Sequence, residues 1–537
     1  MKPGEEVVVP VSLSMDPYAG PWNKEQAAHL LRRTIFGPTF QQITSAVSAG
    51  MNATVAQILT IPVLDPPLTV SANDGIAPIG STWVNSVYPA SNPGASENSR
   101  RESLAAWAMI RINQQSLSIR EKMCLFWQNH FAAEFTFDSR ATYNYHKLIN
   151  THALGNFKQF VKDIAIDPCM LVFLNGATNN VFSPNENFAR ELLELYTVGK
   201  GPQIAPGDYT TFKEEDVLAG AKIMTGWRIQ DFNSTTVNNT SSFFHAQIHD
   251  TTTKNLSEHF GNATVANADE NEYANFIDII FQQPAVATFI CRKIYRYFVN
   301  YDLTPTVEDT IVAVLAETFI NSNYEILPVV EQLLKSDHFY DIALRGTIIK
   351  NPIEYMFSIF NATHSVPNYS LGINYQLYFN AYALCTTIGM SYFQPPSVGG
   401  WTAYYQAPSF TRLWANSSYI KLRFDFASWV TLAGGISVGT SKWGVNHLAF
   451  LNGLSNPSSA PDVINDIVTV FCPKGLSATN ILTLKYILTN GLPDFEWTIQ
   501  YNDYAVDPNN TTVSEPVKTR VALVLDRLFK LPEFQTI

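Results

Sequence analysis

The stretch 183–227 constrains the fold more than any other part of the chain, because two sets of helix signals follow each other there. Serine, proline and glutamate in SPNE (183–186) combine an N-cap, a proline in the first turn and a capping-box acid. Gly199 marks the end of this first helix. A second helix is predicted to open at Thr211, with Glu214 three residues later. Two capped helices joined by a loop are therefore expected here.

Similar patterns recur from residue 23 to the end of the chain, with apolar residues three or four positions apart after a capping residue. The 537 residues, of which 46% are hydrophobic, suffice for a large buried core. We therefore predict a mainly α fold: a large multi-helix globular protein with long irregular loops and at most minor β hairpins.

The helical pattern is interrupted twice, and the interruptions define the expected organisation. Residues 62–98 are rich in Pro, Ser, Gly and Asn, which indicates a surface excursion, and residues 228–265 indicate a loop or a short hairpin. We predict an N-terminal extension over 1–22 and a helical core over 23–427 that contains both excursions. A C-terminal helical region over 428–537 is expected to pack on this core.

Charge and cysteine content argue against several functional classes. The net charge is −11, and the 35 Lys and Arg residues are spread through the chain, so a nucleic-acid surface is not expected. The densest basic groups, in RESLAAWAMIR and CRKIYRYF, have the pattern of ordinary helix faces. Five distant cysteines without a CxxC pair predict neither a disulfide framework nor a zinc knuckle.

Targeting signals are also scarce. No run of 18 apolar residues exists, so no membrane span is predicted, and the first residues do not form a signal peptide. Low charge with abundant Asn, Thr and Tyr nevertheless favours an exported protein, periplasmic or extracellular, over a cytoplasmic one.

Two carboxylates of the stretch 183–227 are predicted at the edges of buried helix faces. Glu191 lies beside the apolar stripe of the first helix, and Asp216 projects beside apolar positions of the second. A carboxylate in this position costs free energy unless it is hydrogen-bonded, paired or bound to a metal. Arg190 and Glu194 follow a second stripe. The two acids are therefore either proton-transfer groups or locks between helices, for example through Arg190.

Histidines supply the second part of a candidate site. His130 falls on an apolar helix stripe, where it is either a satisfied core residue or a ligand or proton-transfer group. A polar loop carries five such residues close together: His245, His249, Asp250, Lys254 and His259. Imidazole and carboxylate groups suit Zn, Fe or Mn, although this spacing matches no firm ligand pattern such as HExxH. His245, His249 and Asp250 are the candidate ligands of a divalent metal ion.

Two further motifs contain candidate residues. RGTIIKNPIEY carries Arg345, Lys350 and Glu354, a mixture that predicts an ion-pair cluster holding helices together. QPPSVGGW ends at Trp401 and combines a rigid Pro-Pro turn with a flexible Gly-Gly pair. This backbone suits a loop placed over a cavity and equally a buried corner.

These motifs together resemble a large bacterial family called domain of unknown function 1800. The matching elements occur in the family's order over approximately residues 27–401: AAHLLRRTIFGPT, WQNHF, NENFARELLELYTVG, EEDV followed by TGW, HD followed by K, RG followed by IKNPIEY, and PPSVGGW. The resemblance implies a mainly helical protein without an established activity. It also implies a partner, a sulfatase-like protein of the family called domain of unknown function 1501.

Two functions fit these observations. The first is a metal-dependent enzyme whose acidic and imidazole side chains converge in one pocket below the loop 394–401: His130, Glu191, Asp216, His249 and Asp250. A divalent metal ion held there would activate water or oxygen. The second is a non-catalytic scaffold that binds a partner protein or an extracellular glycan and uses the same residues to lock helices. Convergence of the five side chains within a few ångströms would distinguish the two.

Overall fold

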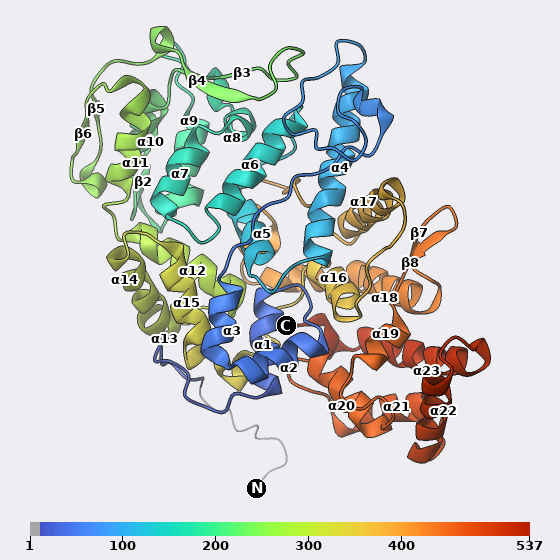
Figure 1. The fold of residues 1–537 in the computed structure, drawn as a ribbon. Coiled ribbons are helices and arrows are strands. Elements are labelled where there is room, and N and C mark those ends of the chain that lie inside the picture. The colour runs from blue at the N-terminus through green and yellow to red at the C-terminus, as the bar shows by residue number, and fades with distance from the viewer. Residues whose placement is uncertain (1–10) are drawn as a thin grey trace.

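Helices dominate the computed structural model, which describes residues 11–537 of the chain (Figure 1). The described residues form 23 α-helices and four two-stranded antiparallel sheets. The prediction of a mainly α protein with minor hairpins is therefore confirmed.

The N-terminal helices lie next to the C-terminal region. α1 begins after Asn23, whose side chain accepts a hydrogen bond from the backbone N–H of Glu25. Residues 11–22 run beside the segment 335–341, where the N–H of Tyr18 donates to the carbonyl of Lys335. Residues 1–10 of the predicted extension lie outside the described residues. The three helices are α1 (Lys24–Thr34), α2 (Phe40–Ala49) and α3 (Met51–Ile58).

The central part of the chain, residues 93–298, is mainly helical. The excursion predicted over 62–98 is mostly irregular, but it ends where α4 begins at Pro93, because proline is favourable in the first helical turn. The helices are α4 (Pro93–Asn113), α5 (Arg120–His130), α6 (Ser139–Thr151), α7 (Phe157–Ala165), α8 (Pro168–Phe173), α9 (Glu186–Glu191), α10 (Glu214–Ile223), α11 (Glu272–Ile280) and α12 (Ala285–Phe298).

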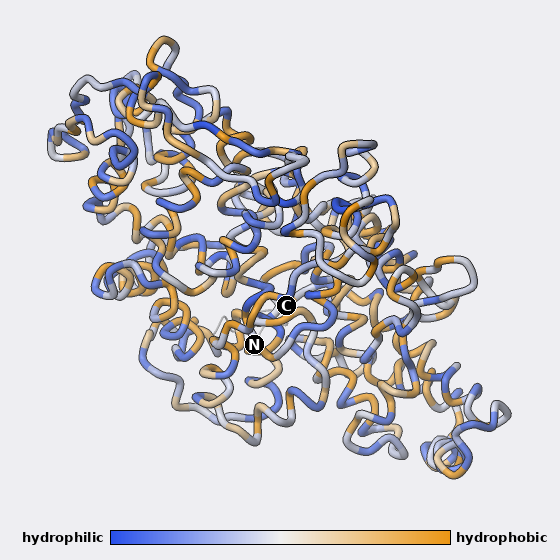
Figure 2. Tube along the Cα trace, turned by 45° about the horizontal axis from the view of Figure 1, so that its top comes forward, coloured by the Kyte–Doolittle hydropathy of each residue, from blue (hydrophilic) through white to orange (hydrophobic). Residues whose placement is uncertain are grey.

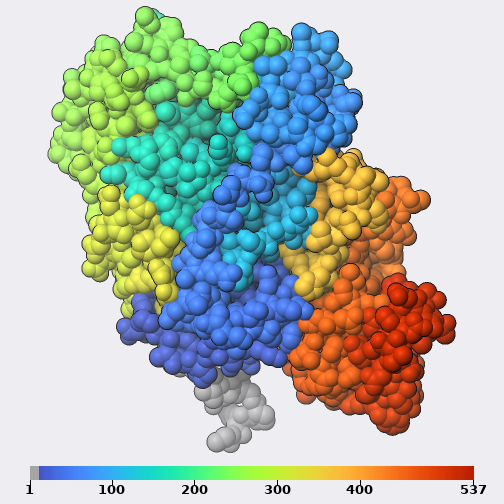
Figure 3. Space-filling model, in the orientation of Figure 1, coloured from blue at the N-terminus to red at the C-terminus, as the bar shows by residue number. Residues whose placement is uncertain are grey.

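The second half of the chain is helical as well. The boundary predicted between residues 427 and 428 falls inside one helix, α18, which continues to Leu432. In Figure 3 the C-terminal residues, orange to red, form a lobe that adjoins the blue N-terminal helices, and α20 packs against α1 and α2. The helices are α13 (Pro305–Val307), α14 (Ala313–Asn321), α15 (Ile326–Lys335), α16 (Pro352–Ala362), α17 (Leu371–Thr387), α18 (Ser417–Leu432), α19 (His447–Asn452), α20 (Ala460–Phe471), α21 (Ala478–Thr489), α22 (Asp494–Val506) and α23 (Thr511–Phe529).

The sheets are short hairpins between helices. The predicted excursion 228–265 contains most of two of them, with loops and short 3-10 turns between. The pairs are β1 (Gln203–Ala205) with β2 (Asp208–Tyr209), β3 (Trp227–Gln230) with β4 (Ser241–Phe244), β5 (Lys254–Asn255) with β6 (Thr264–Val265), and β7 (Ile436–Val438) with β8 (Ser441–Trp443).

The stretch 183–227 contains both predicted helices, but each starts later than predicted. α9 is capped by Asn185, because Ser183 belongs to a preceding turn in which its N–H donates to Asn180. α10 begins after Lys213 rather than at Thr211. The Thr211 hydroxyl donates instead to the carbonyls of Gly199 and Lys200, so it is not available as a cap.

Hydrophobic residues are distributed over all parts of the molecule. Figure 2 shows orange and blue alternating along the trace, as expected for amphipathic helices around a shared core. All five cysteines are buried and free. Within residues 11–537 no single helix is long and apolar enough to span a membrane. Asp269–Ile280 and Ala285–Phe298 reach the required length and composition only together, as a pair bent by 77°.

Candidate active site

His130, the last residue of α5, is buried and held through both ring nitrogens. Its Nε2 lies 3.2 Å from the carbonyl of Tyr196, and its Nδ1 lies 3.0 Å from Nζ of Lys293. Because the carbonyl of Tyr196 only accepts, Nε2 carries the proton that is donated to it, and Nδ1 accepts from Lys293. Burial, with the charge of Lys293 in addition, lowers the pKa of His130 well below its ordinary value. The imidazole is therefore neutral.

A π-helix, Leu192–Thr197, supplies the carbonyl groups of this site directly after α9. The carbonyl of Leu195 accepts a hydrogen bond of 3.0 Å from Nζ of Lys293, and the next carbonyl, that of Tyr196, accepts from His130. A π-helix pairs residues five apart and so changes which carbonyls face a neighbour. The ELLELYTVG motif thus binds both the lysine and the histidine through its backbone.

Lys293, on α12, has no ion-pair partner in the described part of the chain. Burial, with the charge of Arg296 in addition, lowers the pKa of Lys293 to about 7. In its neutral form the amine has two hydrogens, and both are used by His130 and Leu195. The nitrogen lone pair is then free. This residue combines a near-neutral pKa with an unengaged nucleophilic electron pair.

Lys293 and His130 line a pocket with aromatic walls. The walls include Tyr297, Tyr404 and Phe410, and the volume is about 30 Å³, which is room for about two water molecules. Arg296 also lines the pocket. Its guanidinium lies 5.2 Å from the centre of the Phe410 ring, and its buried Nε has no hydrogen-bond partner. The pocket is therefore cationic, apolar at its sides and small.

The predicted loop 394–401 lies against this pocket. The N–H of Trp401 donates to Oδ1 of Asn129 over 2.8 Å, and Gly399 lines the pocket. Gly400 has a φ of +84°, and a Cβ atom there would lie 2.4 Å from the carbonyl oxygen of Asn129. The close approach of the WQNHF and VGGW motifs therefore requires glycine at position 400. Trp401 itself is buried.

His249 belongs to a different cluster, in which every charge is paired. Its Nε2 lies 3.0 Å from one oxygen of Glu272, and Nζ of Lys254 lies 2.6 Å from the other. Lys254 also donates to the backbone carbonyl of Asp250. Although burial lowers it, the hydrogen bond with Glu272 raises the pKa of His249 above its ordinary value. The contacts of His249 and His130 have no residue in common.

Asp216 acts as a lock between α10 and a loop. It is fully buried and accepts hydrogen bonds from the N–H of Lys213 (2.8 Å) and from both the N–H and the hydroxyl of Ser257 (2.7 Å each). These three bonds satisfy the carboxylate without a ligand.

The other acids of the first helix lie near the surface. Glu191 is half-buried, and burial, with the charge of Glu194 in addition, raises its pKa. Arg190 pairs with Glu214 at 2.7 Å, and Glu194 pairs with Lys200 at 3.0 Å. None of these side chains lines the pocket of Lys293.

Arg345, Lys350 and Glu354 do not form the predicted common cluster. Glu354 pairs with Lys122 on α5, and Arg345 pairs with Glu25 at 3.1 Å. Lys350 lies over an aromatic ring and is considered below. Glu354 and Arg345 do not pair within the motif because helices from distant parts of the chain, α5 and α1, supply closer partners.

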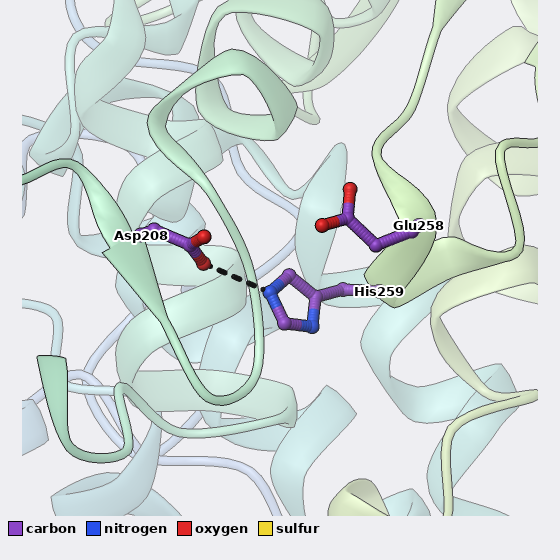
Figure 4. A group of neighbouring side chains, drawn as sticks. All are labelled: Asp208, Glu258 and His259. Atoms are coloured by element: carbon purple, nitrogen blue, oxygen red, sulfur yellow. Dashed lines mark hydrogen bonds and ion pairs between the residues drawn. The ribbon is translucent and has the colours of Figure 1, made fainter. Parts of the chain in front are cut away.

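One group of possible metal ligands is present in residues 11–537: Asp208, Glu258 and His259, whose ligand atoms lie within 4.8 Å of one another. Figure 4 shows the three side chains pointing toward one another, with Nε2 of His259 3.0 Å from Oδ1 of Asp208. Nζ of Lys213 lies 2.6 Å from Glu258. His245, which is half-buried, His249 and Asp250 do not belong to this group.

Sequence patterns did not single out Lys293, Arg296, Glu272, Asp208 or Glu258. A signal existed for the first two, since CRKIYRYF is one of the densest basic groups of an acidic chain.

Residues 29–536 match the model of a family described as a protein of unknown function (DUF1800). No curated protein matches the chain, and no solved structure matches it.

Proposed function

The chain belongs to the DUF1800 family of proteins of unknown function, and we propose that it is an enzyme in which the neutral amine of Lys293 acts on an anionic substrate. The observation that carries this proposal is a lysine without an ion-pair partner, with a pKa of about 7, hydrogen-bonded to a neutral imidazole in a pocket. Perturbed titratable groups in pockets are typical of catalytic sites.

The surrounding groups have complementary roles. At neutral pH a large fraction of Lys293 is unprotonated, so the amine serves as a general base or nucleophile. His130 and the carbonyl of Leu195 take its two hydrogens and so fix the direction of the lone pair. Arg296 suits a carboxylate or phosphate of the substrate, and the aromatic walls suit an apolar part.

Entry of a substrate requires the roof of the pocket to move, because the pocket holds only about two water molecules. The roof contains Gly399 and Tyr405, and the side chain of Tyr405 is 44% exposed. Closing such a loop over a bound substrate excludes water and strengthens the effect of the buried charges.

The test is a titration of the lysine side chains by NMR with ¹³Cε-labelled lysine. The signal that is missing in Lys293→Arg should titrate near pH 7, well below the value of about 10.4 that is usual for a lysine side chain. Acetate or phosphate should raise the pKa of Lys293, since a bound anion favours the ammonium form, and Arg296→Met should weaken that shift. An ordinary pKa for Lys293 would make this proposal wrong.

A metal-dependent enzyme is the second candidate, and the group Asp208, Glu258 and His259 favours it. Imidazole and carboxylate oxygens suit a divalent ion that activates water. Lys213 now balances the two acids, so Lys213→Met should increase metal affinity and His259→Gln should decrease it. Metal analysis of protein purified without chelator is the direct test. Absence of stoichiometric metal, with stability unchanged in EDTA, would exclude this candidate.

A non-catalytic scaffold is the alternative to both enzymes. It is supported by Asp216 and His249, whose hydrogen bonds are satisfied within the protein. Its partner would be the sulfatase-like protein implied by the family resemblance, or a glycan in a periplasmic or extracellular setting. Purification from native extract decides, because a monomer that retains no partner would count strongly against it.

A further inference from the structure

A second buried cavity carries more positive than negative charge. It lies between α1, α5, α16 and α20, and its lining includes Arg32, Lys122, Lys350 and Glu354. Its volume is about 10 Å³, which corresponds to a single particle of about the size of a water molecule.

Only one of the three cations in this cavity is neutralised. Lys122 pairs with Glu354, the one acidic side chain in the lining. Neither Arg32 nor Lys350 has an ion-pair partner among residues 11–537, although they are only 6% and 2% exposed. Two buried positive charges therefore lack a counter-charge.

The hydrogen bonds of these two cations are also incomplete. Arg32 donates from one terminal nitrogen to the carbonyls of Thr469 (2.6 Å) and Val470 (3.2 Å), but its buried Nε has no partner. Nζ of Lys350 lies 3.6 Å from the centre of the Phe534 ring. An aromatic face attracts a cation, but it does not replace a hydrogen-bond acceptor.

A buried charge without a partner is costly, and such a group either loses its charge or gains a counter-ion. Lysine can lose its proton, and burial lowers the pKa of Lys350 well below its ordinary value. Burial lowers the pKa of Arg32 only to about 10, so this guanidinium stays charged at neutral pH. Arg32 therefore needs a counter-ion whether or not Lys350 is protonated.

We propose that this cavity binds one small inorganic anion, chloride, between Arg32 and Lys350. The small volume favours a monatomic anion, because chloride is only slightly larger than a water molecule, whereas a tetrahedral oxyanion is much larger. The anion would connect α1, the segment before α16 and, through the carbonyl contacts of Arg32, the C-terminal helix α20. It would thus stabilise the packing of the first helix against the C-terminal region.

Urea unfolding at constant ionic strength tests the proposal, with chloride replaced by gluconate, which is too large for the cavity. Above the dissociation constant, each tenfold rise in chloride should increase the folding equilibrium constant about tenfold. Lys350→Met should lose this dependence. The matched control Lys421→Met removes a lysine that is 76% exposed and should keep it. An unchanged chloride dependence in Lys350→Met would overturn the proposal.

A second measurement uses the wild-type protein, in case the variant does not fold. Crystals grown in bromide should give an anomalous peak between Arg32 and Lys350. The absence of a peak in this cavity would refute the assignment. A bromide peak without any chloride effect on unfolding would indicate binding at crystal concentration only, which also overturns it.

Discussion

Two regions of this protein bury a lysine close to a histidine, and they differ in one group. In the paired cluster, Lys254 and His249 share the carboxylate of Glu272. In the unpaired site, Lys293 and His130 contact each other and two backbone carbonyls of the π-helix.

The carboxylate determines the chemistry of such a pair. The pKa of His249 is raised by its hydrogen bond with Glu272, whereas the pKa of His130 is lowered by burial and by Lys293. With a carboxylate the pair is an ion network that holds the structure. Without a carboxylate, the imidazole of His130 is uncharged, and the amine of Lys293 has a pKa of about 7. Both groups are then available for proton transfer.

Removing the shared carboxylate should have the largest effect. Glu272→Gln removes the nearer ion-pair partner of buried Lys254 and leaves only Asp250, 3.9 Å from Nζ. We therefore expect a loss of about 3–5 kcal/mol in the free energy of unfolding. Urea denaturation at pH 7 measures it. The control Glu270→Gln changes an exposed acid two residues earlier and should stay within about 0.5 kcal/mol. Equal losses would show that the shared carboxylate has no special role.

The unpaired site should reveal itself in the pH dependence of stability. The pKa of Lys293 is about 7 in the folded protein and about 10.4 when unfolded, so between these values the unfolded state binds more protons. Stability should therefore rise with pH by up to about 1.4 kcal/mol per unit relative to Lys293→Met. Parallel curves for the two proteins from pH 7 to 10 would contradict the depressed pKa.

The paired cluster should respond to pH with the opposite sign and a smaller amplitude. Because the folded pKa of His249 is raised, its contribution is complete below the unfolded value of about 6.5 and is lost as pH rises through the folded value. The wild type should lose stability relative to His249→Gln as pH rises above about 6.5. Glu272→Gln should abolish this difference, since Glu272 is its main favourable cause.

An exposed ion pair should matter least. Arg190 contacts Glu214 and Glu186, yet all three side chains are at least 30% exposed. Arg190→Met should therefore cost less than about 1 kcal/mol, and added salt should reduce the cost further. A loss comparable to that of Glu272→Gln would mean that exposure does not separate these pairs.

Local sequence signals were sufficient for the helices and for part of the site. Apolar spacing placed His130 on a buried face, and His130 is buried in the structure. The sequence predicted Asp216 at the edge of a buried helix face, and in the structure this residue is fully buried. Each of these inferences depends on neighbours within one or two helical turns, which periodicity and capping describe.

The remaining site residues depend on tertiary contacts that local patterns do not contain. Lys293 lies 163 residues from His130 in the sequence, and its helix has an ordinary amphipathic pattern. Glu272 stands in the first turn of α11, where an acid is expected from the helix dipole alone. The basic group CRKIYRYF drew attention to the helix of Lys293, but neither residue type nor spacing indicated that Lys293 and Glu272 are buried beside a histidine.

The π-helix makes the unpaired site sensitive to chain length as well as to side chains. A π-turn contains one residue more than the α-helical turn that would replace it. Deleting a single residue between Leu192 and Thr197 would let the segment become α-helical, with hydrogen bonds between residues four apart in place of five apart, and would change which carbonyls its last turn presents to α5 and α12. The carbonyls that now face Lys293 and His130 would turn away, although no catalytic side chain had changed. In this region, insertions and deletions of residues would change the chemistry of the site more than substitutions would.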